Sequence, residues 1–234
     1  MTSSGNKWLS SLLHLFYPHN CEGCGSALVS DAQFLCTRCI HRLPTTGFFD
    51  KQGNPVEKTF YGRLSLHHAA AVYYFTKASL LQHLLVQLKY KGNREAGYFL
   101  GRMLGHALSK AERFKEVEAL VPLPLNPKKE FIRGYNQSFL LCEGIREIWK
   151  KPVLANAMTR VRFTETQTHR NRLDRWQNME NVFAVTQPES LTNRHILLVD
   201  DVITTGATLE ACGSSILQVP GSRLSVAAVG YTGS

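Results

Sequence analysis

Short apolar runs and segments with a helical period follow one another along most of the chain. Residues 69–75 form an apolar, aromatic-rich run that predicts a strand, and the leucines of residues 80–88 recur at helical spacing, which predicts a helix over about residues 78–90. A second helical period covers residues 98–108, and residues 119–125, with two prolines, are expected to be extended. This succession predicts alternating strands and helices.

The alternation continues toward the carboxyl end. Residues 126–134 are expected to form a basic turn before a further helix, and the apolar run of residues 195–199 is typical of a strand buried on both faces. A loop over residues 200–208, a helix over about residues 209–218 and a strand over residues 225–230 follow it. Because a strand, a loop, a helix and a strand in this order imply a parallel βαβ unit, the expected fold class is α/β, with a mainly parallel sheet flanked by helices.

The first part of the chain follows a different pattern. Four apolar residues between positions 9 and 16 fall on one helix face, which predicts a short amphipathic helix and not a signal peptide, because serines interrupt the segment and no cleavage site follows. Residues 45–63 are rich in Gly, Pro, Thr, Asn and Lys, which predicts a linker or a long loop. We therefore expect an amino-terminal module over residues 1–63 and a larger domain over residues 64–234.

Composition excludes two classes of protein. With 44% apolar residues among 234, the chain can build a core, so a wholly disordered protein is excluded. No apolar stretch approaches the roughly 20 residues that span a bilayer, so we expect no membrane insertion and a cytoplasmic location. Lys and Arg number 27 against 18 Asp and Glu, which gives a net charge of +9 and favours anionic partners.

Four of the six cysteines form one motif, Cys21-x2-Cys24-x11-Cys36-x2-Cys39. Each CxxC pair places two thiolates on one tight turn, and two such turns supply the four ligands of a tetrahedral zinc ion. A full set of four thiolates indicates a structural zinc in a small zinc-ribbon-like module, because a catalytic zinc keeps an open position. The alternative is four unrelated thiols in a loop.

A second motif follows the buried strand of residues 195–199. Two carboxylates lead into a loop that offers consecutive backbone N–H groups and hydroxyls at the start of a helix, which is typical of an anion site. Carboxylates beside an anion site suit a ligand with hydroxyls as well as phosphate, such as a sugar phosphate. The alternative is an ordinary turn with a helix cap. The residues are Asp200, Asp201, Thr204, Thr205, Gly206, Ala207 and Thr208.

The run ILLVDDVITTGATL resembles the phosphoribosyl pyrophosphate (PRPP) motif of type I phosphoribosyltransferases. Together with the motif VPLP, the segment around Arg133-Gly134-Tyr135-Asn136-Gln137 and the four cysteines, it makes nearly the whole chain similar to the ComF family of competence-associated proteins. Tyr135 stands where the family usually has Phe. The resemblance implies the type I phosphoribosyltransferase fold.

The resemblance also assigns roles to these residues. It implies that Asp200 and Asp201 hold the ribose hydroxyls of PRPP, that residues 204–208 hold its 5′-phosphate, and that Mg²⁺ accompanies the pyrophosphate. The basic residues after the strand of residues 119–125 are the candidates for pyrophosphate binding, and a solvated surface is the alternative. These residues are Lys128, Lys129 and Arg133.

An arginine-rich segment without apolar periodicity lies between residues 159 and 178, and we expect a flexible loop there that closes over the pyrophosphate. An arm for nucleic-acid phosphates is the alternative. Its candidate residues are Arg160, Arg162, Gln167, Arg175 and Asn178.

Two functions of different classes follow. The leading hypothesis is an enzyme that binds PRPP with Mg²⁺ and transfers phosphoribose to an unidentified acceptor, in connection with competence and DNA uptake. The alternative is a non-catalytic single-stranded-DNA-binding factor in natural transformation, with DNA-uptake and recombination proteins as partners. A PRPP-sensing regulator is disfavoured because the sequence offers no helix-turn-helix candidate.

Overall fold

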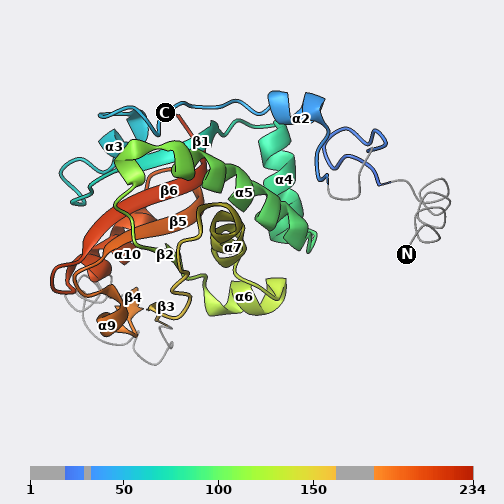
Figure 1. Ribbon diagram of the computed structural model, residues 1–234. Coiled ribbons are helices and arrows are strands. Elements are labelled where there is room, and N and C mark those ends of the chain that lie inside the picture. Colours follow the sequence, from blue (N-terminus) through green and yellow to red (C-terminus); the bar gives the residue numbers. More distant parts are fainter. Residues whose placement is uncertain (1–18, 29–32, 162–181, 234) are drawn as a thin grey trace, which may run out of the picture.

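Four parallel strands form the centre of the molecule (Figure 1). A computed structural model describes residues 19–28, 33–161 and 182–233. Every neighbouring pair in the sheet is parallel, so helices must connect the strands across its faces. In the order in which they lie, the strands are β1 (Ala69–Tyr74), β6 (Arg223–Tyr231), β5 (His195–Ile203) and β2 (Ala119–Pro122).

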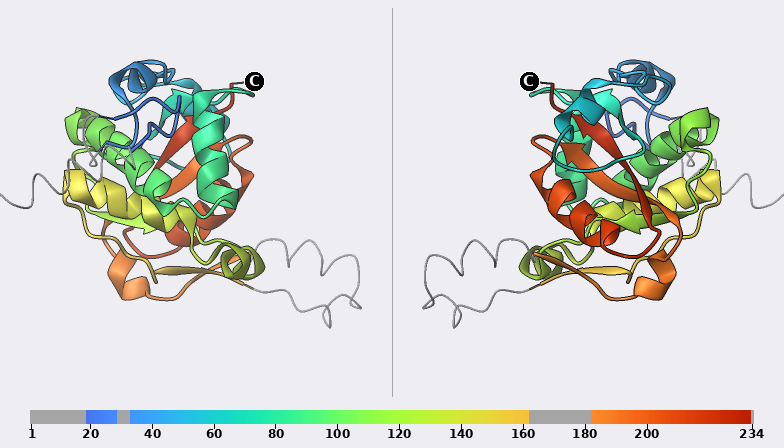
Figure 2. Two further views of the ribbon diagram at one scale, coloured as in Figure 1. Left: turned by 90° about the vertical axis from the view of Figure 1, so that its right-hand side faces the viewer. Right: turned by 90° about the vertical axis from the view of Figure 1, so that its left-hand side faces the viewer.

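Helices cover both faces of this sheet. By the colours of Figure 2, α4 (Leu80–Tyr90), α5 (Arg94–Lys110) and α7 (Gln137–Trp149) lie on one side of the sheet and α10 (Ala207–Leu217) lies on the other. Helix α5 begins four residues before the predicted start, because the side chain of Asn93 accepts a hydrogen bond from Ala96 N and so caps an earlier turn.

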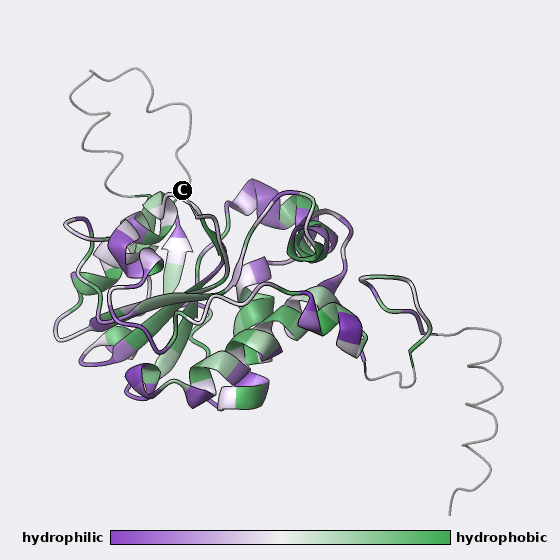
Figure 3. Ribbon diagram, turned by 90° about the horizontal axis from the view of Figure 1, so that it is seen from above, coloured by the Kyte–Doolittle hydropathy of each residue, from purple (hydrophilic) through white to green (hydrophobic). Residues whose placement is uncertain are grey.

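The core lies between the sheet and these helices. Residues Ile196 to Val199 of β5 are fully buried, as the continuous apolar run predicts for a strand covered on both faces. Figure 3 shows hydrophobic residues along the strands and hydrophilic residues mainly on the outer turns and loops. The predicted α/β fold, with a parallel sheet flanked by helices and a four-cysteine cluster toward the amino end, is confirmed.

The segment 45–63, predicted as a linker or a long loop, is not a free linker, because both of its halves pack into the core. It contains the helix α3 (Pro55–Thr59), and the side chains of Val56 and Phe60 are buried. The Asn54 side chain caps this helix by accepting hydrogen bonds from Val56 N and Glu57 N, and it donates one to Ala69 O of β1 at 2.8 Å. A five-residue helix is too short to show a period among glycines and prolines.

The basic turn predicted at residues 126–134 is also wrong, because the segment is the helix α6 (Pro127–Arg133). Asn126 caps it, Pro127 occupies its first turn, and Gly134 ends it in the left-handed conformation with φ of 75°. None of its residues is buried. The helix therefore stands on the surface next to the carboxyl end of β2.

The remaining described elements are short. An antiparallel hairpin of β3 (Met158–Arg160) and β4 (Phe183–Val185) lies beside the main sheet, and the sequence pattern did not predict it. The other short helices are α2 (Thr37–His41), the 3₁₀ turn η1 (Glu112–Phe114) and α9 (Pro188–Leu191). The amphipathic helix predicted near the amino end lies outside the described residues. No helix in the described part of the chain is long and apolar enough to cross a membrane.

The division of the chain at residue 63 stays a prediction. Residues on both sides of it contribute to one continuous hydrophobic cluster, which includes Leu35 and Phe60 as well as the strands of the main sheet. On the free edge of β1, Tyr74 N donates to Pro44 O and Thr46 N donates to Val72 O. The segment that leaves the cysteine module is thus attached to the sheet before it reaches α3.

Candidate functional site

The two adjacent acids of the predicted loop lie inside strand β5. The sequence predicts a strand that ends at residue 199, whereas β5 continues to Ile203 because its pairing with β6 extends to Ile203 and Tyr231. Pairing with β2 on the other side ends at Pro122 and Val199. Asp200 and Asp201 therefore lie beyond the end of β2 but not beyond the end of their own strand.

Asp200 is half-buried and accepts two hydrogen bonds on one carboxylate oxygen. Asp201 N donates to Asp200 Oδ1 at 2.8 Å, and Ser138 Oγ of α7 donates to the same atom at 3.2 Å. Burial, and then the neighbouring Asp201 carboxylate, raise the pKa of Asp200 to about 7, although these hydrogen bonds and Lys89 act in the opposite direction. The group can therefore carry a proton near neutral pH when the site holds no ligand.

Asp201 is buried and forms an ion pair with a residue of another helix. Lys89 Nζ, in the last turn of α4, lies 2.8 Å from Asp201 Oδ1, and the side chains are 24% and 6% exposed respectively. The second oxygen, Asp201 Oδ2, is buried and has no hydrogen-bond partner among the described residues. Buried carboxylate oxygens usually have a donor, so this atom is an unsatisfied acceptor within the described part of the chain.

The predicted phosphate loop leads from β5 into α10. Gly206 has a φ of 73°, and α10 begins at the next residue, so its first N–H groups have no partner within the helix. Such groups and the positive end of the helix dipole favour an anion. A hollow of about 40 Å³ lies here, lined by Asp200 and by residues Val202, Ile203, Thr204, Thr205, Gly206, Ala207, Thr208 and Leu209.

The glycine of this loop is required for a reason that the sequence did not show. A Cβ atom at Gly206 would lie 2.7 Å from Phe60 Cε1, so the loop rests on the aromatic ring that follows α3. Arg63 holds the same loop from the side, because it donates to Thr205 O at 2.8 Å and forms an ion pair with Glu210 of α10. The segment predicted as a linker therefore supports the loop predicted to bind phosphate.

The three predicted pyrophosphate ligands do not converge on the acids. Lys128 and Lys129 are exposed on α6, and no described contact joins either of them to the acid pair. Arg133 donates to Gln137 Oε1 at 2.9 Å and stacks over the ring of Tyr90, 5.4 Å from its centroid. Of the three, Arg133 is therefore the one tied to the helix that carries Lys89.

Of the five candidate residues in the predicted flexible loop, one falls within the described part of the chain. Arg160 ends β3, stacks 5.3 Å from the centroid of the Phe183 ring, and lines a cavity of about 200 Å³ beside the carboxyl end of β2. That cavity also receives the polar side chains of Glu130, Asn136 and Asn156. The remaining predicted loop residues, Arg162, Gln167, Arg175 and Asn178, lie outside the described residues.

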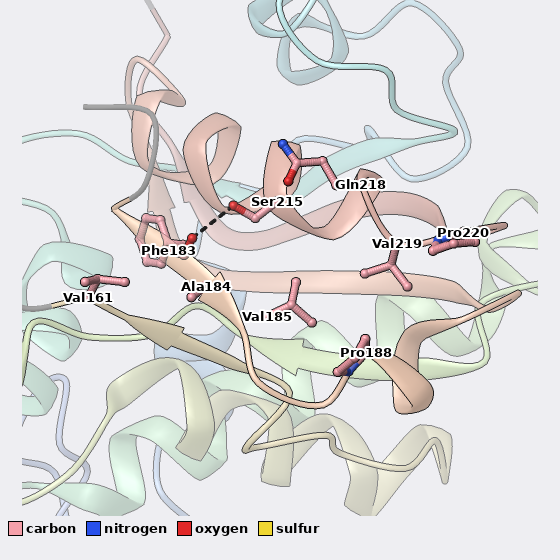
Figure 4. A pocket seen from close by; sticks show the side chains of 9 residues that line it. All are labelled: Val161, Phe183, Ala184, Val185, Pro188, Ser215, Gln218, Val219 and Pro220. Atoms are coloured by element: carbon pink, nitrogen blue, oxygen red, sulfur yellow. Dashed lines mark hydrogen bonds between the residues drawn. The ribbon is translucent and has the colours of Figure 1, made fainter. Parts of the chain in front are cut away.

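A second cavity has a different character. It measures about 410 Å³ and lies between the β3–β4 hairpin, α9 and α10, where Figure 4 shows apolar side chains around Ser215 and Gln218. Ser215 Oγ donates to Phe183 O at 3.1 Å, which ties the hairpin to α10. Among the described residues, none that lines this cavity is charged.

The four cysteines of the predicted zinc module come together. All four sulfur atoms lie within 4.8 Å of one another, and the Cys24 and Cys36 sulfurs are 3.7 Å apart. Four Zn–S bonds of about 2.3 Å would hold the sulfurs roughly 3.8 Å apart, so the cluster could hold a zinc ion. Cys21 and Cys39 are buried, and Cys36 N donates to Cys21 Sγ at 3.2 Å, which fixes the first ligand against the second pair.

Sequence reasoning missed two residues that contact the acid pair. Lys89 lies four residues after the buried Leu85, so it falls on the face of α4 that carries the leucines, where a lysine is unusual. That position was the available signal. Ser138 offered none, because a serine in the first turn of a helix is common.

The comparisons with known proteins agree with these features. No protein-family model matches the chain. Competence protein F of Haemophilus influenzae is 31% identical over 193 residues, which cover 81% of this chain and 74% of that protein. DNA utilization protein YhgH of Escherichia coli O157:H7 is 30% identical over 223 residues, 93% of each chain. Competence protein ComFC of Bacillus subtilis is 29% identical over 144 residues, which cover 62% of this chain and 56% of that protein.

Two solved structures are similar at lower levels. A B. subtilis glutamine PRPP amidotransferase in complex with ADP and GMP matches 58% of this chain and 26% of its own, with 17% identity and a TM-score of 0.43. A hypothetical protein from Neisseria gonorrhoeae with bound ppGpp matches 57% of this chain and 66% of its own, with 17% identity and a TM-score of 0.34. On the identity and coverage of its sequence relatives, the chain belongs to the ComF family of competence and DNA utilization proteins.

Proposed function

We propose that the protein binds PRPP together with Mg²⁺ and transfers its phosphoribosyl group to an acceptor, in the service of DNA uptake. The observation that carries the proposal is the hollow at the amino end of α10, where backbone N–H groups and the Asp200 carboxylate line one small space. A phosphate suits the N–H groups, and sugar hydroxyls suit the carboxylate. The names of the relatives, competence protein and DNA utilization protein, support the cellular context.

The residues of the site would act by binding and positioning. The loop Thr204 to Thr208 holds the 5′-phosphate, and Asp200 and Asp201 accept hydrogen bonds from the ribose hydroxyls. The bond between C1 and the pyrophosphate oxygen breaks, the pyrophosphate leaves with the electron pair, and the acceptor forms the new bond to C1. No described side chain is placed as a general base, so orientation and charge neutralisation supply the catalysis.

Pyrophosphate needs positive charge near the acids. Mg²⁺, held mainly by ligand oxygens and water, would neutralise the leaving group when it is bound. Of the three predicted cations, Arg133 is the one that contacts α4, because its guanidinium stacks on Tyr90. Lys128 and Lys129 are both exposed on α6, where they are free to contact the pyrophosphate as further ligands in this proposal.

Calorimetry with PRPP and Mg²⁺ tests the binding step. The wild-type, zinc-loaded protein should bind PRPP, and Asp200→Asn should weaken binding by about tenfold or more, as expected for the loss of a hydrogen bond to a charged group. Asp50→Asn is the matched control, because Asp50 is exposed and outside the site. Absence of heat at millimolar PRPP with folded wild-type protein would refute the proposal. Pyrophosphate release with nucleobases, amines or DNA ends as acceptors then tests transfer.

One surface favours the alternative function, single-stranded DNA binding. Phe131 and Ile132 of α6 are 90% and 81% exposed, and Lys128 and Lys129 stand on the same helix. Aromatic rings among cations are the elements that stack bases and neutralise phosphates in single strands. The two functions separate by experiment: Phe131→Ala should reduce affinity for a labelled oligonucleotide and leave PRPP binding unchanged, and affinity for DNA should fall steeply with salt.

A further inference from the structure

Lys89 is the cation closest to the proposed ribose site, and nothing in the sequence motif accounts for it. The ammonium group reaches across from α4 to Asp201 Oδ1 at 2.8 Å. The other oxygen of the same carboxylate is buried without a donor among the described residues. We propose that Lys89 is a positioning residue: through its contact with Asp201 Oδ1 it keeps this carboxylate ionised and in one orientation for binding the sugar. This inference rests on the proposed function.

The backbone that carries Lys89 is fixed on both sides. Leu88 is fully buried, and its carbonyl oxygen accepts a hydrogen bond from the Tyr135 hydroxyl. The Arg94 guanidinium lies 5.1 Å from the centroid of the Tyr135 ring, and Arg133 stacks on Tyr90. The last turn of α4 is therefore attached to the end of α6 and to the turn that leads into α7, which fixes the backbone from which Lys89 reaches Asp201.

The charges explain why a cation is needed at this position. Asp200 and Asp201 are adjacent and poorly exposed, and two neighbouring carboxylates cannot both stay ionised in such a place without a compensating charge. Lys89 is the cation that contacts the pair in the described part of the chain. A carboxylate that is held ionised and in one orientation is a better acceptor for a sugar hydroxyl than one that is free to rotate.

Two other roles for Lys89, a direct contact with the ligand and a purely structural ion pair, predict different effects of substitution. A direct contact with the phosphates of the ligand would not depend on Asp201. A purely structural ion pair would affect folding and leave the affinity of the folded protein unchanged. A role exercised through Asp201 makes the two residues energetically coupled, which a double-mutant cycle measures.

The experiment is calorimetry with PRPP and Mg²⁺ on four full-length zinc-loaded proteins: wild type, Lys89→Met, Asp201→Asn and the double variant. Lys89→Met should weaken binding by about tenfold with Asp201 present and by less than about threefold with Asn at that position, because coupled residues are non-additive. An equal loss in both backgrounds, or no loss in either, would overturn the proposal. Absence of binding by the wild type would instead refute the proposed function itself.

Two further variants keep the test decisive if Lys89→Met folds poorly or Asp201→Asn binds too weakly to measure. Lys89→Arg should retain affinity within about threefold of wild type, because a guanidinium can still hold Oδ1. A loss under Lys89→Arg as large as under Lys89→Met would overturn the proposal. Lys91→Met is the matched control: Lys91 is exposed two residues further along and should leave affinity unchanged.

Discussion

Strand β5 carries an ionisable side chain near each end, and burial shifts the two in opposite directions. Near the carboxyl end, burial and Asp201 raise the pKa of Asp200 to about 7. At the amino end, burial, and then the positive charge of neighbouring His67 and Arg223, lower the pKa of His195 to about 4. In both residues burial favours the neutral form, which is a base for histidine and an acid for aspartate.

His195 predicts a loss of stability in weak acid. Its pKa is about 4 in the folded protein against 6.5 for the ordinary group, so between these values the unfolded chain binds more protons. Its contribution is therefore fully present above pH 6.5 and is lost as pH falls toward 4, up to about 3 kcal/mol in total. Urea unfolding of the wild type and of His195→Gln should be measured from about pH 5 to about pH 7.5, a range that includes the ordinary pKa of histidine. The free energy of unfolding should rise more steeply with pH in the wild type than in the variant.

The control for this measurement is His106→Gln, which changes an exposed histidine of α5. It should keep the pH dependence of the wild type. The comparison cancels the opposite contribution of Asp200, because that residue is present in all three proteins. Parallel curves for wild type and His195→Gln would contradict the assignment.

The sequence predicted the residue types of the site better than their contacts. Paired CxxC spacings and the run of acids, threonines and glycine are local features, so their residues could be named from the sequence. The ion pair between Lys89 and Asp201 joins residues 112 positions apart, and no local pattern reports such a contact. The requirement for glycine at position 206 likewise comes from Phe60, far away along the chain.

At the scale of elements, α3 supports the loop proposed to bind phosphate, residues 204–208. Phe60 follows this helix directly, is fully buried, and lies against Gly206, while Arg63 contacts the backbone of the loop. Asn54 holds the start of the helix to β1 through its bond to Ala69 O. The position of the loop that begins α10 is thus fixed by a helix that lies far earlier in the chain.

This packing predicts a difference between two glycines. Gly206→Ala adds a Cβ both at a positive φ and against the Phe60 ring, whereas Gly47→Ala adds one at a φ of 66° with open space around it. The backbone penalty alone is about 1–2 kcal/mol, so Gly47→Ala should lower the free energy of unfolding by that amount. Gly206→Ala should cost about 1–3 kcal/mol more, because Phe60 must move. Chemical denaturation measures both.

The loss should extend to binding only for one of the two variants. Gly206→Ala should weaken PRPP binding, since the N–H groups of the loop move with the backbone, and Gly47→Ala should not. Equal destabilisation by the two substitutions would show that Phe60 does not restrict the loop.

Elements with a long period were predictable, and short capped elements were not. The spacing of the leucines predicted α4, and the apolar run predicted β5. Strand β5 ends four residues after the predicted end at residue 199, because β6 continues to pair with it. Helices α3 and α6 each contain a proline at the start and few apolar residues, so propensity favoured loops. Their Asn caps, Asn54 and Asn126, were the local signal for a helix start.

At the scale of the whole molecule, the cysteine module is attached to the helices that lead to the site. A Cβ at Gly23 would lie 3.0 Å from Leu80 Cδ1, so the first CxxC turn rests on the start of α4. The rings of Phe34 and Phe99 lie 5.0 Å apart, which joins the second half of the module to α5. Helix α4 carries Lys89 in its last turn, so the module contacts one end of the helix and the acid pair the other.

This arrangement predicts what removal of the metal does. A zinc assay should return about one atom per chain, and Cys36→Ser should lose it, because three thiolates leave a structural site open. The melting temperature should fall by several degrees, as expected for roughly 1–2 kcal/mol of lost packing on Leu80 and Phe99. Circular dichroism should still show the helices of the main domain, since the four cysteines of the zinc motif lie outside its sheet and outside the helices that cover it.

The effect on the site decides whether the module is only an appendage. If it stabilises α4, Cys36→Ser should also weaken PRPP binding, by less than Lys89→Met does, because Tyr135 still holds the last turn of the helix through Leu88. His41→Gln is the matched control, an exposed residue of the module that should retain zinc and affinity. Retention of a full equivalent of zinc by Cys36→Ser would contradict the four-cysteine site, and unchanged binding after zinc loss would separate the module from the function of the domain.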